Sequence, residues 1–509
     1  MDRYPVDGHL LSDRGTLPIP SDSRSTKMSE RDIPVRSPFL NGHWIEPQNP
    51  LAVVNPADGT RVALVGTVTR PQVRQALEDA AAAWRNWRQT PARRRGQYLN
   101  AIAEILQRRS DELARTITLE NGKPLAQSQS EVAITIDHFR WFAGEAERIY
   151  GRVVPHQVPD KRHLVIRSPI GVVGAIAPWN FPLMLAVRKA APAMASGCPV
   201  IVKPASATPL SCLLLAEAVA EARLPAGVFQ VVVGAAAEIA AEFQENPICR
   251  KISFTGSTEV GRQLIAGAAE TVTKLSLELG GHAPVLVFDD ADIEQAVEGT
   301  LIAKFRNTGQ SCIAANRVYV QAAVYDRFVQ RLVERTRELK VGDGFEPDVE
   351  IGPLIDARAL ENALKHIDEA RSLGARVLCG GKRWEACPQG NFLEPTVLAE
   401  VPPNALCMRE ETFAPILPVA PFDDEDQAIH HANDTSYGLA AYAFTRDLSR
   451  MWRLAENIEA GTIGINHTVP ATSQCPFGGL KHSGWGRELG AEGIDAYLET
   501  KHISIGVDA

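Results

Sequence analysis

A cysteine follows a Gly-Gln-Ser turn in the stretch FRNTGQSC, which covers residues 305–312. A thiolate is a strong nucleophile toward a carbonyl carbon, but most buried cysteines are inert, so Cys312 alone is weak evidence of catalysis. The turn follows a predicted helix and precedes a predicted strand, and reactive groups are often held on such loops. Arg306 lies just upstream and places a cation near the thiol. A cation at the end of a helix is also favourable by itself, so a purely structural role stays open for Arg306.

Two further segments carry residue types that suit covalent carbonyl chemistry. KLSLELGG (274–281) sets Glu278 among apolar neighbours, where desolvation would raise its pKa and make it a general base near neutral pH. APWNFP (177–182) holds Asn180 between an aromatic residue and a proline, and a rigid side-chain amide is a good oxyanion donor. The alternatives are a carboxylate at a strand end that faces solvent and a solvated turn asparagine.

Three segments have the composition of a phosphate or cofactor site. VIVKPAS (200–206) is a predicted buried strand that ends in Lys203, and SFTGSTEVG (253–261) is a strand, a glycine turn and a helix start. Helix N-terminal amides bind phosphate in this arrangement, although the usual G-x-G-x-x-G is missing. EETFAP (410–415) can also be an ordinary polar turn.

The bulk composition of the 509 residues is that of a globular protein, with 45% hydrophobic and 22% charged residues. A net charge of −8 argues against a nucleic-acid partner. The eight cysteines form no C-x-x-C pair or Cys/His cluster, which disfavours a metal site or disulfides and favours the cytoplasm. The apolar stretch 170–187 is interrupted by Pro178 and Pro182, so we expect no membrane span there.

The elements that must position these residues alternate between strands and helices. Residues 1–36 are rich in Ser, Pro, Asp and Arg and are predicted to be a disordered arm. Helical periodicity begins at residue 70, and apolar β-rich runs alternate with amphipathic stretches after residue 163. Continuous apolar strands separated by helices predict parallel sheets covered on both faces, here in two α/β domains.

Taken together, the motifs resemble the aldehyde dehydrogenase superfamily over nearly the whole chain after residue 37. They are PWNFP, KPA, FTGSTEVG, LELGG, GQSC, EETFAP and PFGGLKHSGWGRE, in that order. The resemblance implies an α/β fold with a Rossmann-type cofactor domain, an α/β catalytic domain and a small β oligomerisation arm. The implied boundaries are 37–148 and 168–287 for the cofactor domain, 288–476 for the catalytic domain, and 149–167 and 491–509 for the arm.

By this resemblance Cys312 is the nucleophile, Glu278 the general base and Asn180 an oxyanion donor. Aldehyde oxidation would then pass through a thiohemiacetal and a thioester on Cys312, which water activated by Glu278 hydrolyses. The cofactor would be NADP or NAD, bound by Trp179, Lys203, Ser206, Gly256, Ser257, Glu411 and Phe413. NAD-selective members often carry a glutamate at the position of Ser206, so we expect that NADP is accepted, and a preference for NADP over NAD stays an open alternative.

The substrate expectation rests on Arg306 and on Arg188, which follows Asn180 by two helical turns. The succinate-semialdehyde dehydrogenase branch has arginines at both motif positions, where they bind the distal carboxylate. A guanidinium pair suits bidentate carboxylate recognition. Thr472 or Ser473, in the loop 466–479, can supply a further hydroxyl.

Some residues depart from the branch and leave alternatives open. The position two residues after Cys312 is Ala314, so the redox switch of branch members with a second cysteine there is not expected. His467 and Cys475 are unusual in the substrate loop and leave glutarate semialdehyde, a sulfonated aldehyde or a general aldehyde as alternatives. A Cys-His hydrolase and an inactive structural protein are less consistent with the cofactor motifs. The bridging strands of the arm imply a homodimer or homotetramer.

Overall fold

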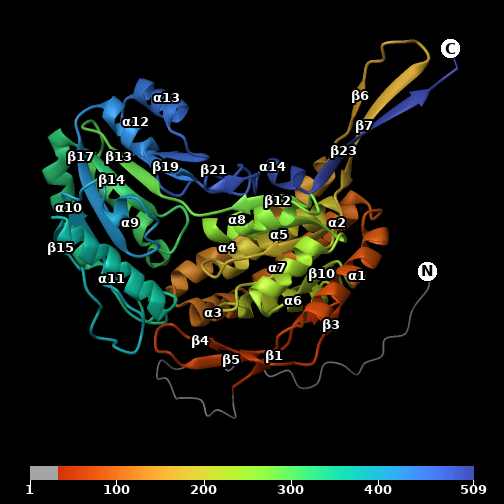
Figure 1. Cartoon of the computed structure of the whole chain (residues 1–509), viewed down its shortest axis with the longest axis horizontal. Coiled ribbons are helices and arrows are strands. Elements are labelled where there is room, and N and C mark those ends of the chain that lie inside the picture. The colour runs from red at the N-terminus through yellow and green to blue at the C-terminus, as the bar shows by residue number, and fades with distance from the viewer. Residues whose placement is uncertain (1–32, 509) are drawn as a thin grey trace.

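Figure 1 shows a computed structural model, which describes residues 33–508. Most of the arm predicted at 1–36 therefore lies outside the described residues. Its last part is not disordered, because β1 (Val35–Arg36) pairs in parallel with β5 (Arg61–Val65). On its other side β5 pairs with β4 (Leu51–Val54) to complete a three-stranded sheet. Composition alone had indicated disorder, whereas this short strand is held by backbone hydrogen bonds to a distant partner.

An eight-stranded sheet carries the motifs predicted for the cofactor domain. Its five central strands are parallel and largely buried, and β22 and β2 flank them in antiparallel pairings. The order is β22 (Gly484–Trp485), β12 (Lys274–Glu278), β11 (Cys249–Thr255), β8 (Val172–Ile176), β9 (Val200–Lys203), β10 (Phe229–Val231), β2 (Phe39–Leu40) and β3 (His43–Trp44).

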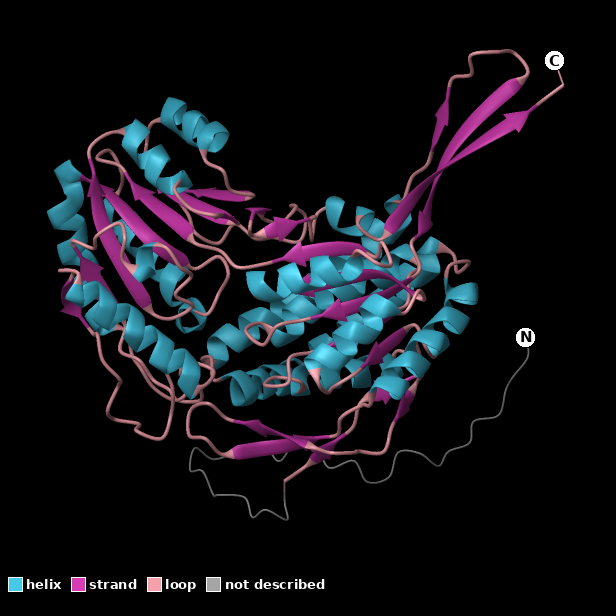
Figure 2. Ribbon diagram, viewed as in Figure 1, coloured by secondary structure: helices cyan, strands magenta, loops and turns pink. Residues whose placement is uncertain are grey.

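Helices cover both faces of this sheet, as the continuous apolar strands predict (Figure 2). Val173 and Ala175 of β8 pack in one core, and their neighbours Val172 and Ile176 pack in another on the opposite face. The first core contains α2 (Ala92–Arg108), α3 (Ser110–Asn121), α4 (Leu125–Glu145), α5 (Pro182–Ser196) and α6 (Leu210–Glu221), and the second α1 (Arg70–Trp87), α7 (Ala236–Glu245) and α8 (Thr258–Ala268).

A seven-stranded sheet forms the second α/β unit, and all its strands except the edge strand β15 run parallel. The order is β15 (Arg376–Cys379), β16 (Thr396–Ala399), β17 (Ile416–Phe422), β14 (Ala315–Gln321), β13 (Ala283–Val287), β19 (Ala440–Phe444) and β20 (Thr462–Ile465). Its helices are α9 (Ile293–Phe305), α10 (Tyr325–Glu338), α11 (Ala357–Ser372), α12 (Glu425–Asn433) and α13 (Leu448–Asn457).

The chain passes between the two sheets at residues 279–282, because β12 belongs to the first sheet and β13 to the second. The predicted boundary after residue 287 falls after β13, whereas the chain changes from one sheet to the other before that strand. The apolar run APVLVF shows that a buried strand exists, but not which sheet it joins.

A three-stranded arm projects from the body in Figure 1. It contains β6 (Arg152–Val154), β7 (Lys161–Pro169) and β23 (Leu498–Gly506), with β7 paired to both others in antiparallel register. The predicted arm segment 149–167 contains all of β6 and most of β7, but no feature of the sequence indicated that it forms two separate strands. The segment 491–509 also contains a helical turn, α14 (Glu492–Asp495), before β23 begins.

The apolar stretch 170–187 is divided between β8 and the first turns of α5, with the PWN turn between them. Pro182 occupies the first turn of α5, where its missing N–H costs nothing. Within residues 33–508 no helix has the length and apolar character needed to cross a membrane.

Candidate active site

The loop that carries Cys312 begins with a tight turn, η3 (Arg306–Gly309), directly after α9. Asn307 and Thr308 have φ values of 50° and 57°, and a left-handed β-branched residue is uncommon. Hydrogen bonds hold this turn: Gln127 Oε1 accepts from the Asn307 amide at 2.7 Å, and Thr308 Oγ1 donates to the Gly352 carbonyl at 3.1 Å. The loop is therefore fixed by residues distant in sequence, as a preorganised nucleophile loop requires.

Asn180 lies against this loop. Its Nδ2 donates to the Gln310 carbonyl at 3.1 Å, and its own carbonyl accepts from Lys123 Nζ at 2.6 Å and Asn307 Nδ2 at 2.8 Å. The residue is 4% exposed, so both its backbone and its side chain are immobilised. A side-chain amide has two N–H donors, and the one not used by Gln310 remains available for an oxyanion.

Glu278 reaches the same region from the end of β12. The Gly-Gly turn after it packs against the cysteine loop, because a Cβ on Gly281 would lie 2.0 Å from the Cys312 carbonyl oxygen. The Glu278 side chain is buried, and its Oε2 has no hydrogen-bond partner within residues 33–508. Burial, reinforced by Glu488, raises the Glu278 pKa well above 4.5, against the opposing charge of Lys189. A carboxylate of this kind is a stronger base than an exposed one.

The Cys312 thiol is protonated at neutral pH. Burial raises its pKa to about 12, the Glu411 carboxylate adds to the rise, and the Arg188 guanidinium opposes it. Of the eight cysteines, Cys312 is half-buried and Cys475 is exposed, and all eight are free. Sulfur attack therefore has to be coupled to removal of the thiol proton.

The loop around Glu411 and Phe413 joins the site through three contacts. The Trp179 and Phe413 rings meet edge-on, with centroids 5.5 Å apart, and Glu411 Oε1 accepts from the Gly281 amide at 3.0 Å. A Cβ on Gly309 would lie 2.3 Å from the Ala414 carbonyl oxygen. Burial raises the Glu411 pKa to about 7. The motifs PWNFP, LELGG, GQSC and EETFAP are thus in mutual contact.

The residues at the C-terminal ends of β9 and β11 fit a dinucleotide. Lys203 is 4% exposed, its Nζ donates to the Pro204 carbonyl at 3.0 Å, and burial lowers its pKa to about 8. Within residues 33–508 no acid forms an ion pair with it, so a buried cation is left for a polar ligand such as a ribose or phosphate. Ser206 is exposed in the turn that follows.

The predicted phosphate turn has the expected form. Ser257 caps α8, and its Oγ accepts from the Val260 amide at 3.3 Å. A Cβ on Gly256 would lie 2.4 Å from the Phe254 ring, so glycine leaves room for that ring where the strand turns into the helix. The first amides of α8 that Ser257 does not cap have no acceptor within the helix, and such amides bind an anion favourably.

The two arginines of the substrate hypothesis are on α5 and at the end of α9. Arg188 is 5% exposed, its guanidinium carbon lies 4.8 Å from the Phe477 ring centre, and its Nε donates to His138 Nε2 at 3.2 Å. Arg306 is half-buried, 5.3 Å from the Phe181 ring centre. Burial lowers the pKa of both arginines, and the Arg188 charge lowers the Arg306 pKa further. Neither forms an ion pair with an acid of residues 33–508.

The loop residues Thr472 and Ser473 are occupied by other partners. Thr472 Oγ1 donates to Gln474 Oε1 at 2.6 Å, and Ser473 Oγ lies 2.9 Å from His138 Nδ1 and also contacts Asp137. His467 and Cys475 are exposed. Sequence reasoning missed His138, Lys189 and Glu488, which surround the predicted residues from α4, α5 and the loop before α14. A buried histidine or lysine within a helical pattern carries no local signal of its partner.

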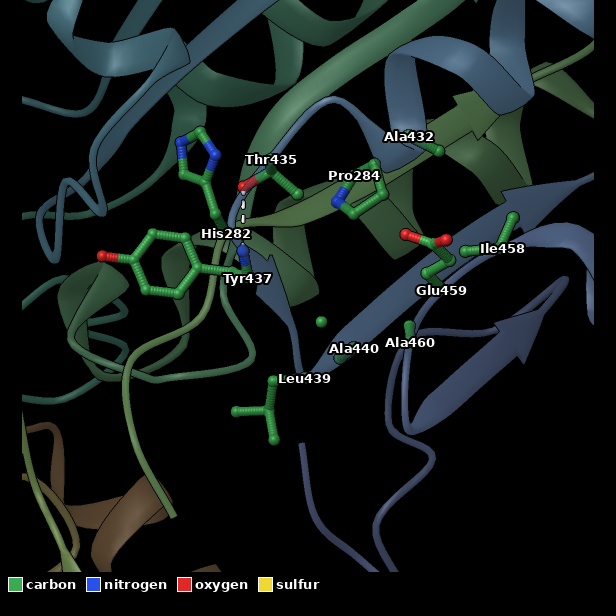
Figure 3. A pocket seen from close by; sticks show the side chains of 11 residues that line it. His282, Pro284, Ala432, Thr435, Tyr437, Leu439, Ala440, Ile458, Glu459 and Ala460 are labelled. Atoms are coloured by element: carbon green, nitrogen blue, oxygen red, sulfur yellow. Dashed lines mark hydrogen bonds between the residues drawn. The ribbon is translucent and has the colours of Figure 1, made fainter. Parts of the chain in front are cut away.

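A hollow beside the site is too small for a substrate. It has a volume of about 10 Å³, roughly what one water molecule needs. Figure 3 shows its lining, which includes His282, Tyr437, Leu439 and Glu459. His282 is buried and its pKa is lowered well below 6.5, so this hollow holds no free cation for a substrate carboxylate.

This site, on this pair of sheets, defines a class of enzyme. Residues 44–503 match the model of the aldehyde dehydrogenase family, and the chain belongs to that family. It is 47% identical to the succinate-semialdehyde dehydrogenase [NADP(+)] GabD of Escherichia coli, over 94% of this chain and all of that one. It is also 47% identical to the glutarate-semialdehyde dehydrogenase of Pseudomonas putida, over 92% of this chain and 97% of that one.

Among solved structures, an NADP-dependent enzyme of E. coli superposes with a TM-score of 0.92 at 47% identity, over 94% of this chain and all of that one. The fold class and family predicted from the motifs are therefore confirmed.

Proposed function

We propose that the protein oxidises an aldehyde that carries a distal carboxylate, succinate semialdehyde to succinate, with NADP+ or NAD+. One observation carries the choice of substrate: Arg188 is a buried cation and Arg306 a half-buried one, and neither forms an ion pair with an acid among residues 33–508. Buried like charges without a counterion are unfavourable, and a substrate carboxylate would supply the missing charge. The names of the two relatives, which act on four- and five-carbon semialdehydes, agree with this substrate class.

The chemistry begins at Cys312. Its sulfur attacks the aldehyde carbon and the thiol proton leaves through solvent or the Glu278 carboxylate, which gives a thiohemiacetal oxyanion. The free N–H of Asn180 and the Cys312 backbone N–H stabilise that oxygen. A bound nicotinamide supplies the hydride acceptor, and Trp179, Lys203, Glu411 and the start of α8 would hold it.

The thioester on Cys312 is then hydrolysed. Glu278 takes a proton from water as the water oxygen attacks the thioester carbon, and the carbon–sulfur bond breaks to release the carboxylic acid and the Cys312 thiolate. Its raised pKa makes the ionised Glu278 basic enough for this step. The free thiolate is reprotonated before the next turnover.

The test compares kcat/KM for succinate semialdehyde with that for butanal in the wild type, Arg188→Ala and Arg306→Ala. Each charged hydrogen bond contributes about 1.5–3 kcal/mol, so two arginines predict a preference of about 10²–10⁴ for the acid. Each variant removes one of the two contributions and should lose about a factor of 10–10² of that preference, while kcat/KM for butanal changes little. Arg409→Ala, which removes a surface arginine paired with Asp434, is the matched control.

Equal or better oxidation of butanal would instead make the protein a general aldehyde dehydrogenase. Glutarate semialdehyde and a three-carbon sulfonated aldehyde belong in the same assay, because the arginines would also bind a longer acid or a sulfonate. The substrate with the highest kcat/KM that is also most sensitive to Arg188→Ala identifies the acid.

The arm supports a homo-oligomer. Val153, Ile166 and Ile505 are apolar and exposed on its strands, and a narrow sheet that protrudes alone is marginally stable in water. We expect Ile166→Asp to shift sedimentation from a dimer or tetramer toward the monomer, with Lys161→Asp as the control. A reducing cytoplasmic location agrees with the eight free cysteines, and fractionation of the producing cell tests it.

A further inference from the structure

A chain of hydrogen bonds runs from Arg188 to the protein surface through three elements. Arg188 Nε on α5 donates to His138 Nε2 on α4 at 3.2 Å, and His138 Nδ1 lies 2.9 Å from Ser473 Oγ in the loop after β20. Ser473 Oγ contacts Asp137 Oδ2, and its backbone carbonyl accepts from the Gly490 amide at 2.9 Å. His138 and Ser473 are 1% and 3% exposed, whereas Asp137 is exposed.

The direction of every hydrogen bond in this chain is determined by its two ends. A guanidinium only donates, so His138 Nε2 must be the bare acceptor and Nδ1 must carry the ring proton. Nδ1–H then donates to Ser473 Oγ, and the serine hydroxyl donates to the Asp137 carboxylate, which only accepts. Burial and the neighbouring Arg188 charge lower the His138 pKa well below 6.5, in agreement with this neutral tautomer.

This series of hydrogen bonds restrains the Arg188 guanidinium on one edge. His138 holds Nε, the Phe477 ring covers one face, and Met184 Sδ lies 3.9 Å from Nη2. Within residues 33–508 no group accepts a hydrogen bond from Nη1. The edge that carries the two terminal nitrogens therefore keeps donors for a ligand, in an orientation set by His138.

We propose that His138, through Ser473 and Asp137, is a positioning residue that aims Arg188 at the distal carboxylate of the substrate. This inference rests on the proposed function, since it needs Arg188 to bind that carboxylate. The inference also revises the expected role of Ser473. The Ser473 hydroxyl accepts from His138 and donates to Asp137, so Ser473 acts on the substrate through Arg188 and not by direct contact.

The same residue types suggest a hydrolytic triad, but the connections differ. In a triad the histidine lies between the acid and the serine and accepts the serine proton. Here the serine lies between the acid and the histidine, its proton goes to Asp137, and Arg188 occupies the only bare nitrogen of the ring. Ser473 is therefore not activated as a nucleophile.

The experiment measures kcat and KM for succinate semialdehyde and butanal in His138→Phe and His138→Gln. Phenylalanine removes both ring nitrogens, so we expect KM for the acid to rise about tenfold, the equivalent of one weakened charged hydrogen bond. Saturating kcat and kcat/KM for butanal should stay within about twofold. Glutamine offers a carbonyl to Arg188 and an N–H to Ser473, so His138→Gln should return KM to within about threefold of wild type.

His366→Phe is the matched control, because His366 is also a buried helical histidine but lies on α11 in the other unit. It should leave the ratio of the two KM values unchanged. If His138→Phe does not fold, Ser473→Ala keeps the ring and removes only the acceptor for Nδ1–H, and we expect a smaller rise in KM for the acid alone.

The variant Arg188→Ala separates the proposed function from the positioning role of His138. Loss of acid preference in that variant with no KM change in His138→Phe and Ser473→Ala would overturn the positioning role and leave the proposed function standing. An equal rise for butanal, or no rescue by glutamine, would also overturn it, since either result indicates general disruption of the core. Unchanged acid preference in Arg188→Ala itself would refute the proposed function.

Discussion

Substituting Asn180 with alanine should separate catalysis from stability. The variant loses the N–H that faces the reacting oxygen, and loss of one such donor in acyl-transfer sites costs about 2.7–4 kcal/mol, a factor of about 10²–10³ in kcat. It also loses the hydrogen bond to the Gln310 carbonyl, which is 3.1 Å long.

The structure indicates that loss of the hydrogen bond from Asn180 to the Gln310 carbonyl costs little stability. The Gln310 carbonyl keeps Asn307 Nδ2 as a donor at 3.1 Å, so it is not left bare in the core. The Asn180 carbonyl, which accepts from Lys123 and Asn307, belongs to the backbone and survives the substitution. Stability should therefore fall by about 0.5–1.5 kcal/mol, the net value of an ordinary hydrogen bond. The catalytic effect, about 2.7–4 kcal/mol, should therefore exceed the effect on stability.

The assay is the formation of reduced cofactor in a single turnover, with the thermal midpoint measured on the same preparation. Asn121→Ala is the control, because Asn121 Nδ2 donates to the Trp179 carbonyl at 3.0 Å and restrains the same turn without facing Cys312. Thr208 also donates to that carbonyl, so we expect less than a tenfold change in this control. If Asn121→Ala slows the reaction as much as Asn180→Ala, or if Asn180→Ala keeps kcat within threefold, the oxyanion role is refuted.

Three further predictions address the thiol, the base and the cofactor. Glu278→Gln should give a burst of one reduced cofactor per active site, because formation of the thioester continues. The steady-state rate that follows should be about 10²–10⁴ lower than in the wild type, because hydrolysis of the thioester loses its base. A missing burst would contradict the assignment of Glu278 as that base. Because the Cys312 pKa is raised to about 12, its thiolate fraction should rise about tenfold per pH unit from pH 7 to 10, and the alkylation rate of the ligand-free protein should rise with it. Peptide mass spectrometry can follow the alkylation of Cys312, with exposed Cys475 as the reference. A plateau near pH 8 would contradict the raised pKa. Ser206→Glu should lower kcat/KM with NADP+ at least tenfold relative to NAD+, since a carboxylate beside Lys203 repels a 2′-phosphate; equal losses with both cofactors would show that Ser206 does not face the ribose.

The sequence indicated the loops of the candidate site because they are local motifs, and the catalytic roles of their residues stay predictions. Cys312, Glu278 and Asn180 each follow a strand or helix end whose type is evident from nearby residues, and the structure brings their loops into contact. The α/β alternation likewise predicted parallel, doubly covered sheets.

What the sequence could not predict depends on partners remote in the chain. The run APVLVF is a strand in either sheet, and only its pairing with β14 and β19 assigns it to the second. Likewise, His138 lies in an amphipathic pattern like any buried helical residue, and its contacts with Arg188 and Ser473 depend on how three segments pack. Strand β6 is only three residues long, too short for a periodic signal.

The contact of Gly281 with the Cys312 carbonyl has a consequence for how the protein unfolds. The segment 279–282 is both the passage between the two sheets and a wall of the cysteine loop. If the two sheets separate, the segment 279–282 must move away from the cysteine loop. If the cysteine loop unfolds locally, the segment 279–282 loses the contact that holds it. The two α/β units are thus joined at the cysteine loop, which makes the candidate active site part of one cooperative unit rather than an independently melting edge. Heat inactivation and loss of tertiary structure would then share one midpoint.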